Sequence, residues 1–217
     1  MIFTCIGHAK FLIELENGMR IVTDPYDKTC GYPVTSVPAD VVLVSHGHHD
    51  HNAVETIPGT PRVIDKAGEY DLGDGVTVTA VEADHDDAGG TKRGKTLLFS
   101  IRAEGMNAVH LGDLGHLPTQ AQCEKLGLVD VLMIPVGGFF TIDASAAKET
   151  AALLHARVVL PMHYKTRANA DWPIATVEKF TKLFASPAEE IDMLRVAAGD
   201  MMCQPEIAIL RPQSLKY

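Results

Sequence analysis

The stretch SHGHHDHN, residues 45–52, places four histidines and an aspartate within a few positions of each other. It overlaps the end of the apolar run DVVLVS, residues 40–45, whose length and composition predict a buried β-strand ending at the cluster. Imidazole and carboxylate groups are the usual protein ligands of zinc and related divalent ions. The pattern H-x-H-x-D-H therefore makes His46, His48, Asp50 and His51 candidate metal ligands, with Gly47 supplying the backbone freedom of a tight turn.

Four ligands are too many for one catalytic ion with an open position, but they suit two ions about 3.5–4 Å apart. We expect further ligands after other strands, because neighbouring strands bring their ends to one rim of a sheet. Three predicted strands end in suitable side chains, at His85, Asp113 and His163. Asp113 is the only carboxylate of the three and could bridge two ions. The alternatives are an exposed acidic turn at His85, a strand-end turn at Asp113 and a core histidine at His163.

The composition restricts the function. Acidic residues outnumber basic ones 28 to 19, giving a formal net charge of −9, so nucleic acid is a disfavoured partner. Residues 1–18 lack the basic start of a signal peptide, and the uncharged stretch 131–142 is too short to span a membrane. We expect a cytoplasmic protein without membrane contact. Four dispersed cysteines favour reduced thiols over disulfides or a thiolate zinc site.

The hydrophobic patterns predict a strand-rich first half, followed by strands that alternate with helices. Expected strands cover residues 1–6, 10–16, 19–24, 40–45, 76–82, 95–103, 106–113, 130–135, 157–161, 193–197 and 206–211. Expected helices cover residues 118–126, 143–156 with Asp143 as N-cap, and 177–185. Asn17-Gly18 suits a type I′ turn, and a second hairpin is expected at Glu104-Gly105. This order predicts a single domain, residues 1–217, of two sheets packed face to face with helices outside.

In the order of these residues the chain resembles the metallo-β-lactamase superfamily, in which an H-x-H-x-D-H motif is followed by a His, an Asp and a final His. The order matches over nearly the whole chain. Five further stretches resemble the compact branch of metal-dependent hydrolases related to the ascorbate-6-phosphate lactonases: GHAKFLIE (7–14), VTDPY (22–26), HLGDLGH (110–116), IPVGGFFTIDA (134–144) and VLPMHYKT (159–166).

The resemblance implies a four-layer αββα sandwich with two mixed sheets flanked by helices. It also implies a ligand set: one ion on His46, His48 and His85, the other on Asp50, His51 and His163, and Asp113 bridging. Asp24 would accept a hydrogen bond from a ligating histidine and fix its orientation. Several antibiotic-degrading members have cysteine in place of Asp113, so β-lactam cleavage is disfavoured.

Our hypothesis is a binuclear hydrolase in which a metal-bound hydroxide attacks a small, anionic ester, lactone or phosphodiester. No G-x-S-x-G nucleophile motif is present. The cofactors would be two divalent ions, zinc first, with manganese, iron and nickel also compatible. Asp50 is a candidate proton acceptor and His116 a candidate catalytic residue, while His8 could contact substrate or support the site.

Basic residues near the predicted site are candidate anchors for an anionic substrate. They are Lys92, Arg93 and Lys95 in GGTKRGK (89–95), and Lys165 and Arg167 after His163. Residues 137–140, GGFF, could line the pocket or form a buried turn. His49, at an intervening position of the motif, and His155, on a predicted helix, are expected to lie away from the metals.

Three other functions remain open at the level of sequence: a non-catalytic metal-binding protein of the same fold, a nuclease and a di-iron redox protein. The short chain without an extended basic face disfavours the nuclease. The sequence leaves the substrate and a homo-oligomeric state open.

Overall fold

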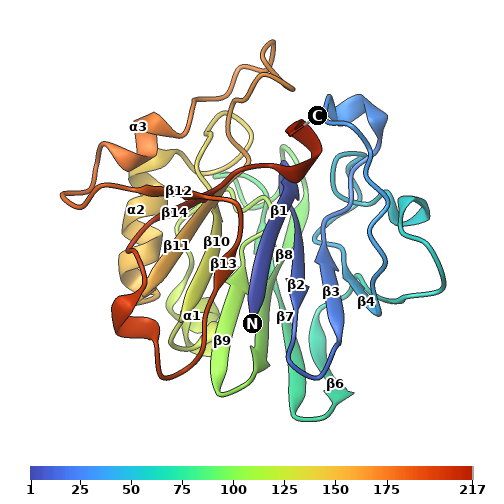
Figure 1. Cartoon of the computed structure of the whole chain (residues 1–217). Coiled ribbons are helices and arrows are strands. Elements are labelled where there is room, and N and C mark those ends of the chain that lie inside the picture. The colour runs from blue at the N-terminus through green and yellow to red at the C-terminus, as the bar shows by residue number, and fades with distance from the viewer. Residues whose placement is uncertain (217) are drawn as a thin grey trace.

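Two six-stranded β-sheets face each other in the computed structural model, which describes residues 1–216 (Figure 1). The first sheet has the order β13 (Leu194–Arg195), β1 (Ile2–Gly7), β2 (Lys10–Glu14), β3 (Arg20–Thr23), β4 (Val41–Leu43), β5 (Arg62–Ile64). The second has the order β11 (Val158–Met162), β10 (Val131–Pro135), β9 (Met106–His110), β8 (Lys95–Ala103), β7 (Val76–Asp84), β6 (Gly68–Gly73). A small parallel pair joins β12 (Glu189–Ile191) to β14 (Ala208–Leu210).

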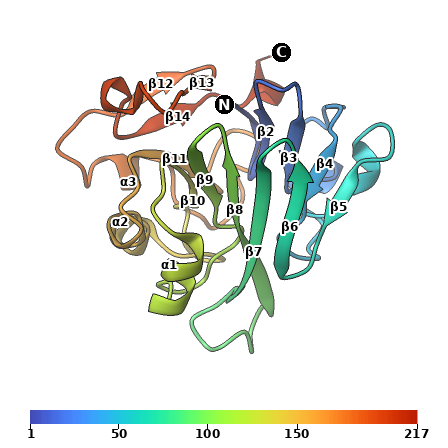
Figure 2. The same cartoon turned by 90° about the horizontal axis from the view of Figure 1, so that it is seen from below.

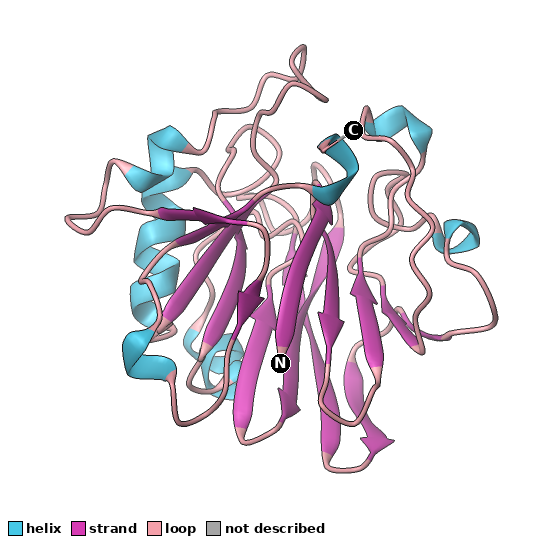
Figure 3. Ribbon diagram, in the orientation of Figure 1, coloured by secondary structure: helices cyan, strands magenta, loops and turns pink. Residues whose placement is uncertain are grey.

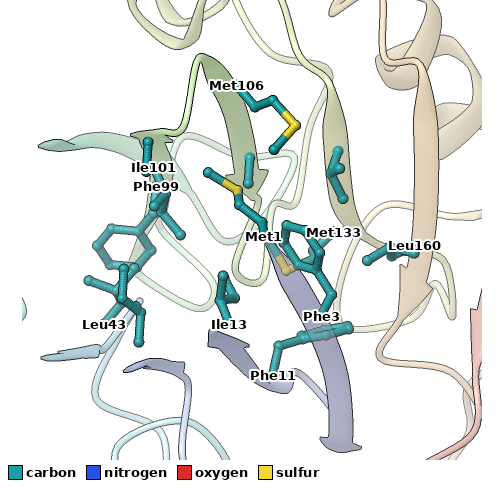
Figure 4. Packing of buried hydrophobic residues seen from close by; sticks show 14 of the residues in the cluster. Met1, Phe3, Phe11, Ile13, Leu43, Phe99, Ile101, Met106, Met133 and Leu160 are labelled. Carbon is teal, nitrogen blue, oxygen red and sulfur yellow. The ribbon is translucent and has the colours of Figure 1, made fainter. Parts of the chain in front are cut away.

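The main core fills the space between the two sheets. Phe3 and Ile13 from the first sheet are fully buried, and they belong to the same cluster as Phe99 and Ile101 from β8 (Figure 4). Burying one such side chain contributes about 1.5–3 kcal/mol relative to leaving it exposed. The hydrophobic contact of the inner faces therefore fixes how the two sheets lie on each other.

The three α-helices all cover the outer face of the second sheet (Figures 2 and 3). They are α1 (Gln120–Leu126), α2 (Ala144–Leu153) and α3 (Glu178–Thr181). Asp143 caps α2 as predicted, accepting a hydrogen bond from the Ala146 N–H. None of the helices within residues 1–216 is long and apolar enough to cross a membrane.

Within residues 1–216 the outer face of the first sheet is covered by loops and short 3₁₀ turns instead of α-helices. Val22 and Val42 pack there against Val37 and Ile57, which belong to loops. The 3₁₀ turns of this part are η1 (Lys28–Cys30) and η2 (Val54–Thr56), while η3 (Met201–Cys203) and η4 (Gln213–Leu215) lie near the chain end. The predicted sandwich of two mixed sheets flanked by helices is confirmed, with the helical layer on one side reduced to short turns in the described chain.

Strand direction brings the carboxyl ends of several strands of both sheets to one edge of the sandwich. β1 and β3 are each antiparallel to β2 and therefore run parallel to one another, and β4 is parallel to β3. In the second sheet β7 and β9 are each antiparallel to β8, and β10 and β11 are parallel to β9. The carboxyl ends of β1, β3, β4, β7, β9 and β11 therefore meet where ligands bind in sheets of this kind.

Of the two predicted hairpin turns, the one at Glu104-Gly105 is confirmed and the one at Asn17-Gly18 differs in type. Gly18 has a positive φ of 87°, but Asn17 is absent from the positive-φ residues, so a type I′ turn at Asn17-Gly18 is wrong. Glu104-Gly105 is a two-residue turn with both φ angles positive, at 56° and 72°, between the paired residues Ala103 and Met106, and Asp74-Gly75 between β6 and β7 is another, at 50° and 75°. Glu104 is held there because its Oε1 accepts a hydrogen bond from the Glu16 N–H at 2.7 Å.

Some elements differ in extent. The helix expected over residues 177–185 is wrong beyond Thr181, because the following turns close through i+3 contacts such as Leu183 N–H to the Phe180 carbonyl at 3.0 Å. The strands β5, β6 and β12 were not predicted. β5 and β12 are short, and β6 contains two glycines that obscure its alternation.

Candidate metal centre

Every predicted metal ligand lies just after a strand end on this shared edge. His46 to His51 follow β4, His85 follows β7, Asp113 follows β9 and His163 follows β11, while His8 and Asp24 follow β1 and β3. Three of these residues have left-handed backbones, with φ of 54° at His8, 38° at Asp24 and 51° at His163. Such conformations cost about 1–3 kcal/mol each and concentrate at functional sites.

Two groups of side chains each have potential ligand atoms that all lie within 4.8 Å of one another: one contains His46, His48 and His85, and the other contains Asp50, His51 and His163 together with His8. A third group, His46, His51 and Asp113, links the two. His46 Nε2 and His48 Nδ1 are 2.9 Å apart. The two groups correspond to the two predicted ligand sets, with His8 as an addition to the second.

Asp113 lies between the groups. Its Oδ2 is 3.3 Å from the Nε2 atoms of both His85 and His163, and its Oδ1 is 3.3 Å from His51 Nε2. Two ligands bound at 2.0–2.1 Å to one zinc ion in a tetrahedral site are roughly 3.3 Å apart. The spacing of the donor atoms thus fits shared ions between them.

Unpartnered buried atoms provide a second test of whether these residues fit a metal. Among residues 1–216, His51 Nε2 and Asp113 Oδ1 are buried and lack a hydrogen-bond partner, as does Nδ1 of His85 and of His163. Leaving such a group unpaired costs about 1–3 kcal/mol. Divalent ions would satisfy His51 Nε2 and Asp113 Oδ1, which face each other. The donor set therefore fits the metals that the sequence pattern implied.

Asp24 and Ser45 contact two of the candidate ligands on the side away from Asp113. Asp24, fully buried, accepts hydrogen bonds through Oδ2 from His51 Nδ1 at 2.9 Å and from Ser45 Oγ at 2.7 Å. Its Oδ1 accepts the Ser45 N–H at 2.7 Å, and Ser45 Oγ is 2.9 Å from His46 Nδ1. One carboxylate thereby orients a histidine from each ligand group, because donation from Nδ1 directs Nε2 inward.

Burial and mutual charge set the protonation of the groups. Burial, aided by His163, lowers the pKa of His8 to about 4, and burial, aided by His51, lowers the pKa of His46 to about 3. Burial opposes charge on His51 as well, but Asp113 and Asp24 outweigh it and raise its pKa well above the usual value. Burial would raise the pKa of Asp50, but the adjacent His51 and His8 imidazoles lower it far below normal. The carboxylates are therefore ionised at neutral pH.

A cavity of about 350 Å³ opens on the centre. It is lined by His48, His49, Asp50, His85, Arg93, Asp113, Phe140, His163 and Trp172. Arg93 is the one Lys or Arg side chain of this lining among residues 1–216, and its guanidinium lies over the Phe140 ring at 5.7 Å. The cavity is thus lined by candidate metal ligands, aromatic side chains and one cationic side chain.

The loop that carries Arg93 is held by Asp86. The buried Asp86 carboxylate accepts four backbone N–H groups, from Ala88 and Gly90 on Oδ1 and from Lys92 and Arg93 on Oδ2, at 2.8–2.9 Å. The closed loop directly follows His85, a candidate ligand. A fixed backbone places the Arg93 side chain at the cavity rather than in solvent.

The other basic candidates lie elsewhere. Lys92 pairs with Asp87 at 2.6 Å, Lys95 contacts Asp84, and Arg167 donates to the Leu215 carbonyl. Lys165 is half-buried and is not part of the cavity lining within residues 1–216. Of the five basic residues that the sequence offered, the structure brings Arg93 alone to the centre.

His116 lines a neighbouring cavity of about 500 Å³ that shares Arg93 and Phe140 with the first. Its Nε2 accepts the Asp84 N–H at 3.1 Å and its Nδ1 is 2.7 Å from the Leu117 carbonyl oxygen. Both ring nitrogens are thus engaged by backbone. His49 is exposed with Nδ1 2.8 Å from Thr29 Oγ1, and His155 is exposed beyond α2.

The structure also tests the predictions made for Gly47 and for the stretch 137–140. Gly47 has no left-handed φ, and a Cβ there would meet only Asn52 Nδ2 at 4.0 Å, so the requirement for glycine backbone freedom is wrong. In the stretch 137–140, Gly137 forms a close backbone contact, since a Cβ would lie 2.2 Å from the His163 carbonyl oxygen. Phe140 contributes the cavity wall.

The sequence did not single out Trp172 or His110. Trp172 lies in an irregular segment whose spacing carries no signal, yet its ring is 5.3 Å from that of His8. His110 ends β9 fully buried; its Nε2 is 3.0 Å from the Ala9 carbonyl oxygen and its Nδ1 accepts the Gly112 N–H. It ties the two sheets together behind the centre.

Comparison with known proteins agrees with the geometry. Residues 3–163 match the family model of the β-lactamase superfamily domain. A UPF0173 metal-dependent hydrolase of Methanoculleus marisnigri is 31% identical, covering 92% of this chain and 100% of the relative. Another, of Thermococcus kodakarensis, is 30% identical and covers 86% and 93%. A crystal structure from Thermotoga maritima, assigned as a Zn-dependent hydrolase of the metallo-β-lactamase superfamily, is 39% identical with a TM-score of 0.79, covering 96% and 97%.

The chain belongs to the metallo-β-lactamase superfamily and, within it, to the UPF0173 metal-dependent hydrolases. The predicted resemblance and fold class are confirmed, and the protein is a metal-dependent hydrolase. Its His and Asp cluster is the part of the described chain that could hold the metal.

Proposed function

We propose that this hydrolase is binuclear. His46, His48 and His85 would hold one ion, Asp50, His51 and His163 the other, and Asp113 would bridge them. The grouping of the ligand atoms and the 3.3 Å spacings around Asp113 support this assignment. Imidazole and carboxylate donors without thiolate suit zinc, and also manganese, iron or nickel. Two bound ions would polarise the scissile bond and lower the pKa of water.

The substrate is a small anionic molecule with an ester, lactone or phosphodiester bond. The observation that carries this proposal is the position of Arg93, the single cation at a cavity of about 350 Å³ that otherwise presents metal ligands and aromatic rings. A cavity of this size lies within the range of small-molecule sites. An arginine fork pairs well with carboxylate or phosphate oxygens, and its contact with Phe140 holds it in place.

Asp50 acts as a ligand and as a proton acceptor in this proposal. It lines the cavity and is ionised at neutral pH, as both roles require, and its lowered pKa makes it a weak base that accepts a proton only transiently. We assign no proton transfer to His116, because both of its ring nitrogens contact backbone groups. His116 contributes instead to the wall of the adjoining cavity.

The test uses two 4-nitrophenyl esters of equal acyl length, one ending in a carboxylate and the other in a methyl ester. Arg93→Ala should raise KM for the anionic ester about 10–150-fold, as expected when a hydrogen bond to a charged group worth about 1.5–3 kcal/mol is lost. KM for the neutral ester should stay the same. Lys165→Ala is the matched control, since this half-buried lysine lies outside the cavity lining described for residues 1–216.

An equal KM change for both esters, or none for either, would refute the anionic substrate. Arg93→Lys separates charge from shape, because lysine keeps the charge but loses the planar fork. A lactone and phosphodiester panel on the same variants then assigns the bond class. The same dependence on Arg93 should appear for each anionic substrate that is cleaved.

A further inference from the structure

We propose that His8 is a direct ligand of the ion that Asp50, His51 and His163 hold, so that this ion is bound more tightly than the other. The proposal rests on the binuclear site proposed above and adds a residue from the start of the chain to it. With His8 as a ligand, the two ions would differ in affinity: one would be enclosed and tightly bound, and the other would exchange readily.

The position of His8 is the first argument. It follows β1 at the shared strand edge and is 3% exposed, with a left-handed φ of 54°. Its ring centroid lies 4.2 Å from that of His163 and 5.3 Å from that of His51. A strained backbone therefore directs the imidazole into the ligand group rather than away from it.

The unpartnered nitrogens are the second argument. Among residues 1–216 neither ring nitrogen of His8 has a hydrogen-bond partner, although both are buried. Its Nε2 is 3.3 Å from Asp50 Oδ2 without making a hydrogen bond. This is the spacing found between the other ligand atoms and Asp113, and it fits two atoms that point to one ion.

The two groups differ in enclosure. His8, Asp50, His51 and His163 are all buried, whereas His48 in the other group is exposed. With His8, the enclosed group has four protein ligands in addition to the bridging Asp113, which is typical of a closed structural ion, whereas the other group has three and leaves the open position to its own ion. A more complete and less accessible ligand set holds its ion more tightly, so a chelator should remove the ion of the exposed group first.

The test measures metal affinity, with His8→Asn as the variant. Asparagine tolerates a left-handed backbone, so the substitution removes the imidazole without adding strain. His155→Asn is the matched control, because His155 has a φ of 49° and is exposed away from the centre. Stepwise zinc affinities are measured by competition with a chromophoric chelator, and Co²⁺-loaded samples are compared by visible absorption.

We expect His8→Asn to weaken the tighter step by more than about 100-fold, beyond the about 10–100-fold effect of residues that only orient ligands. The Co²⁺ absorption should change as well, while His155→Asn should match the wild type in both measurements. Circular dichroism of the metal-free variants checks folding. A loss below about 100-fold with an unchanged Co²⁺ spectrum would overturn the proposal and make His8 a residue that positions Asp50.

A measurement on the unmodified protein decides the case even if the variant does not fold. In the zinc-loaded chain with ¹⁵N-labelled histidine, we expect six imidazoles with metal-shifted ring nitrogens, the histidines of both groups. Five, with His8 unshifted, would overturn the proposal. If the wild type binds one ion, the binuclear function fails, and the His8 resonance still decides whether His8 is a ligand of that ion.

Discussion

His51 Nε2 and Asp113 Oδ1 lie 3.3 Å apart, yet neither atom has a hydrogen-bond partner in the described chain. On its other side the His51 ring contacts Asp24 through Nδ1. A charged pair that existed only to stabilise the fold would make the hydrogen bond, because buried charge is costly when unpaired. The geometry instead fits two atoms that share an ion, which is why these residues dominate the predictions below.

Metal binding should release one proton per chain from His51 at pH 8, in addition to the proton that metal-bound water loses. The pKa of His51 is raised well above its usual value by Asp113 and Asp24 against the effect of burial, so its metal-free form is protonated, whereas His46 and His8 are already neutral. A ligating imidazole must be deprotonated. Zinc titration by calorimetry in two buffers of different ionisation enthalpy measures the release. No release would contradict the assignment of His51 as the protonated ligand.

Asp24→Asn should weaken zinc binding about 10–100-fold, because the carboxylate that orients His51 and Ser45 loses one acceptor oxygen. The metal-free variant should also be less stable by about 3–5 kcal/mol, as expected when one partner of a buried pair is neutralised. Chelator competition and denaturant unfolding measure the two effects. Asp192→Asn, at an exposed ion pair, is the control and should change neither. Unchanged affinity in Asp24→Asn would remove its orienting role.

Gly115→Ala should displace His85. A Cβ at residue 115 would lie 2.2 Å from the Asp86 nitrogen and 2.4 Å from the His85 carbonyl carbon, and these backbone atoms cannot move independently of the ligand. We expect loss of the ion from the group of His46, His48 and His85, measured as metal content after brief dialysis. Gly199→Ala, where nothing lies within 4 Å of the added Cβ, is the control. Full retention of both ions in Gly115→Ala would show that metal binding does not depend on the position of His85.

Asp86→Asn should raise KM for the anionic ester several-fold and leave the neutral ester unchanged. The variant keeps one acceptor oxygen and replaces the other with an NH₂ group, so two of the four loop N–H groups lose their acceptor and the loop fixes Arg93 less firmly. In Arg93→Ala the same change should have no further effect, because both act on one contact. Additive effects in the double variant would mean that Asp86 acts through another part of the site.

The strand pattern was sufficient to predict most of the candidate site. His46, Asp113 and His163 each follow an apolar run, and the alternating direction of the strands carries these ends to one edge. The placement of His8 needed the structure, because a histidine beside a glycine after a strand is common and its burial depends on the pairing of β1 with β2. Trp172 belongs to a loop for which no periodic signal exists.

Local rules failed where a tertiary contact overrides them. Glu104 has a left-handed conformation that its residue type disfavours, because Glu16 binds its carboxylate, whereas the favourable sequence Asn17-Gly18 forms a different turn. The choice of Arg93 among five basic residues likewise depends on Asp86, whose four backbone contacts shape the loop. Charge and spacing alone could not distinguish these residues.

The central claim is a binuclear centre bridged by Asp113, and elemental analysis of the purified protein beside Asp113→Ala and His163→Ala tests it most directly. We expect about two divalent ions per wild-type chain and a marked loss in both variants, together with loss of ester hydrolysis measured on the same samples. His155→Asn should keep the wild-type metal content. One ion or none in the wild type, with the same content in Asp113→Ala and His163→Ala, would contradict the account.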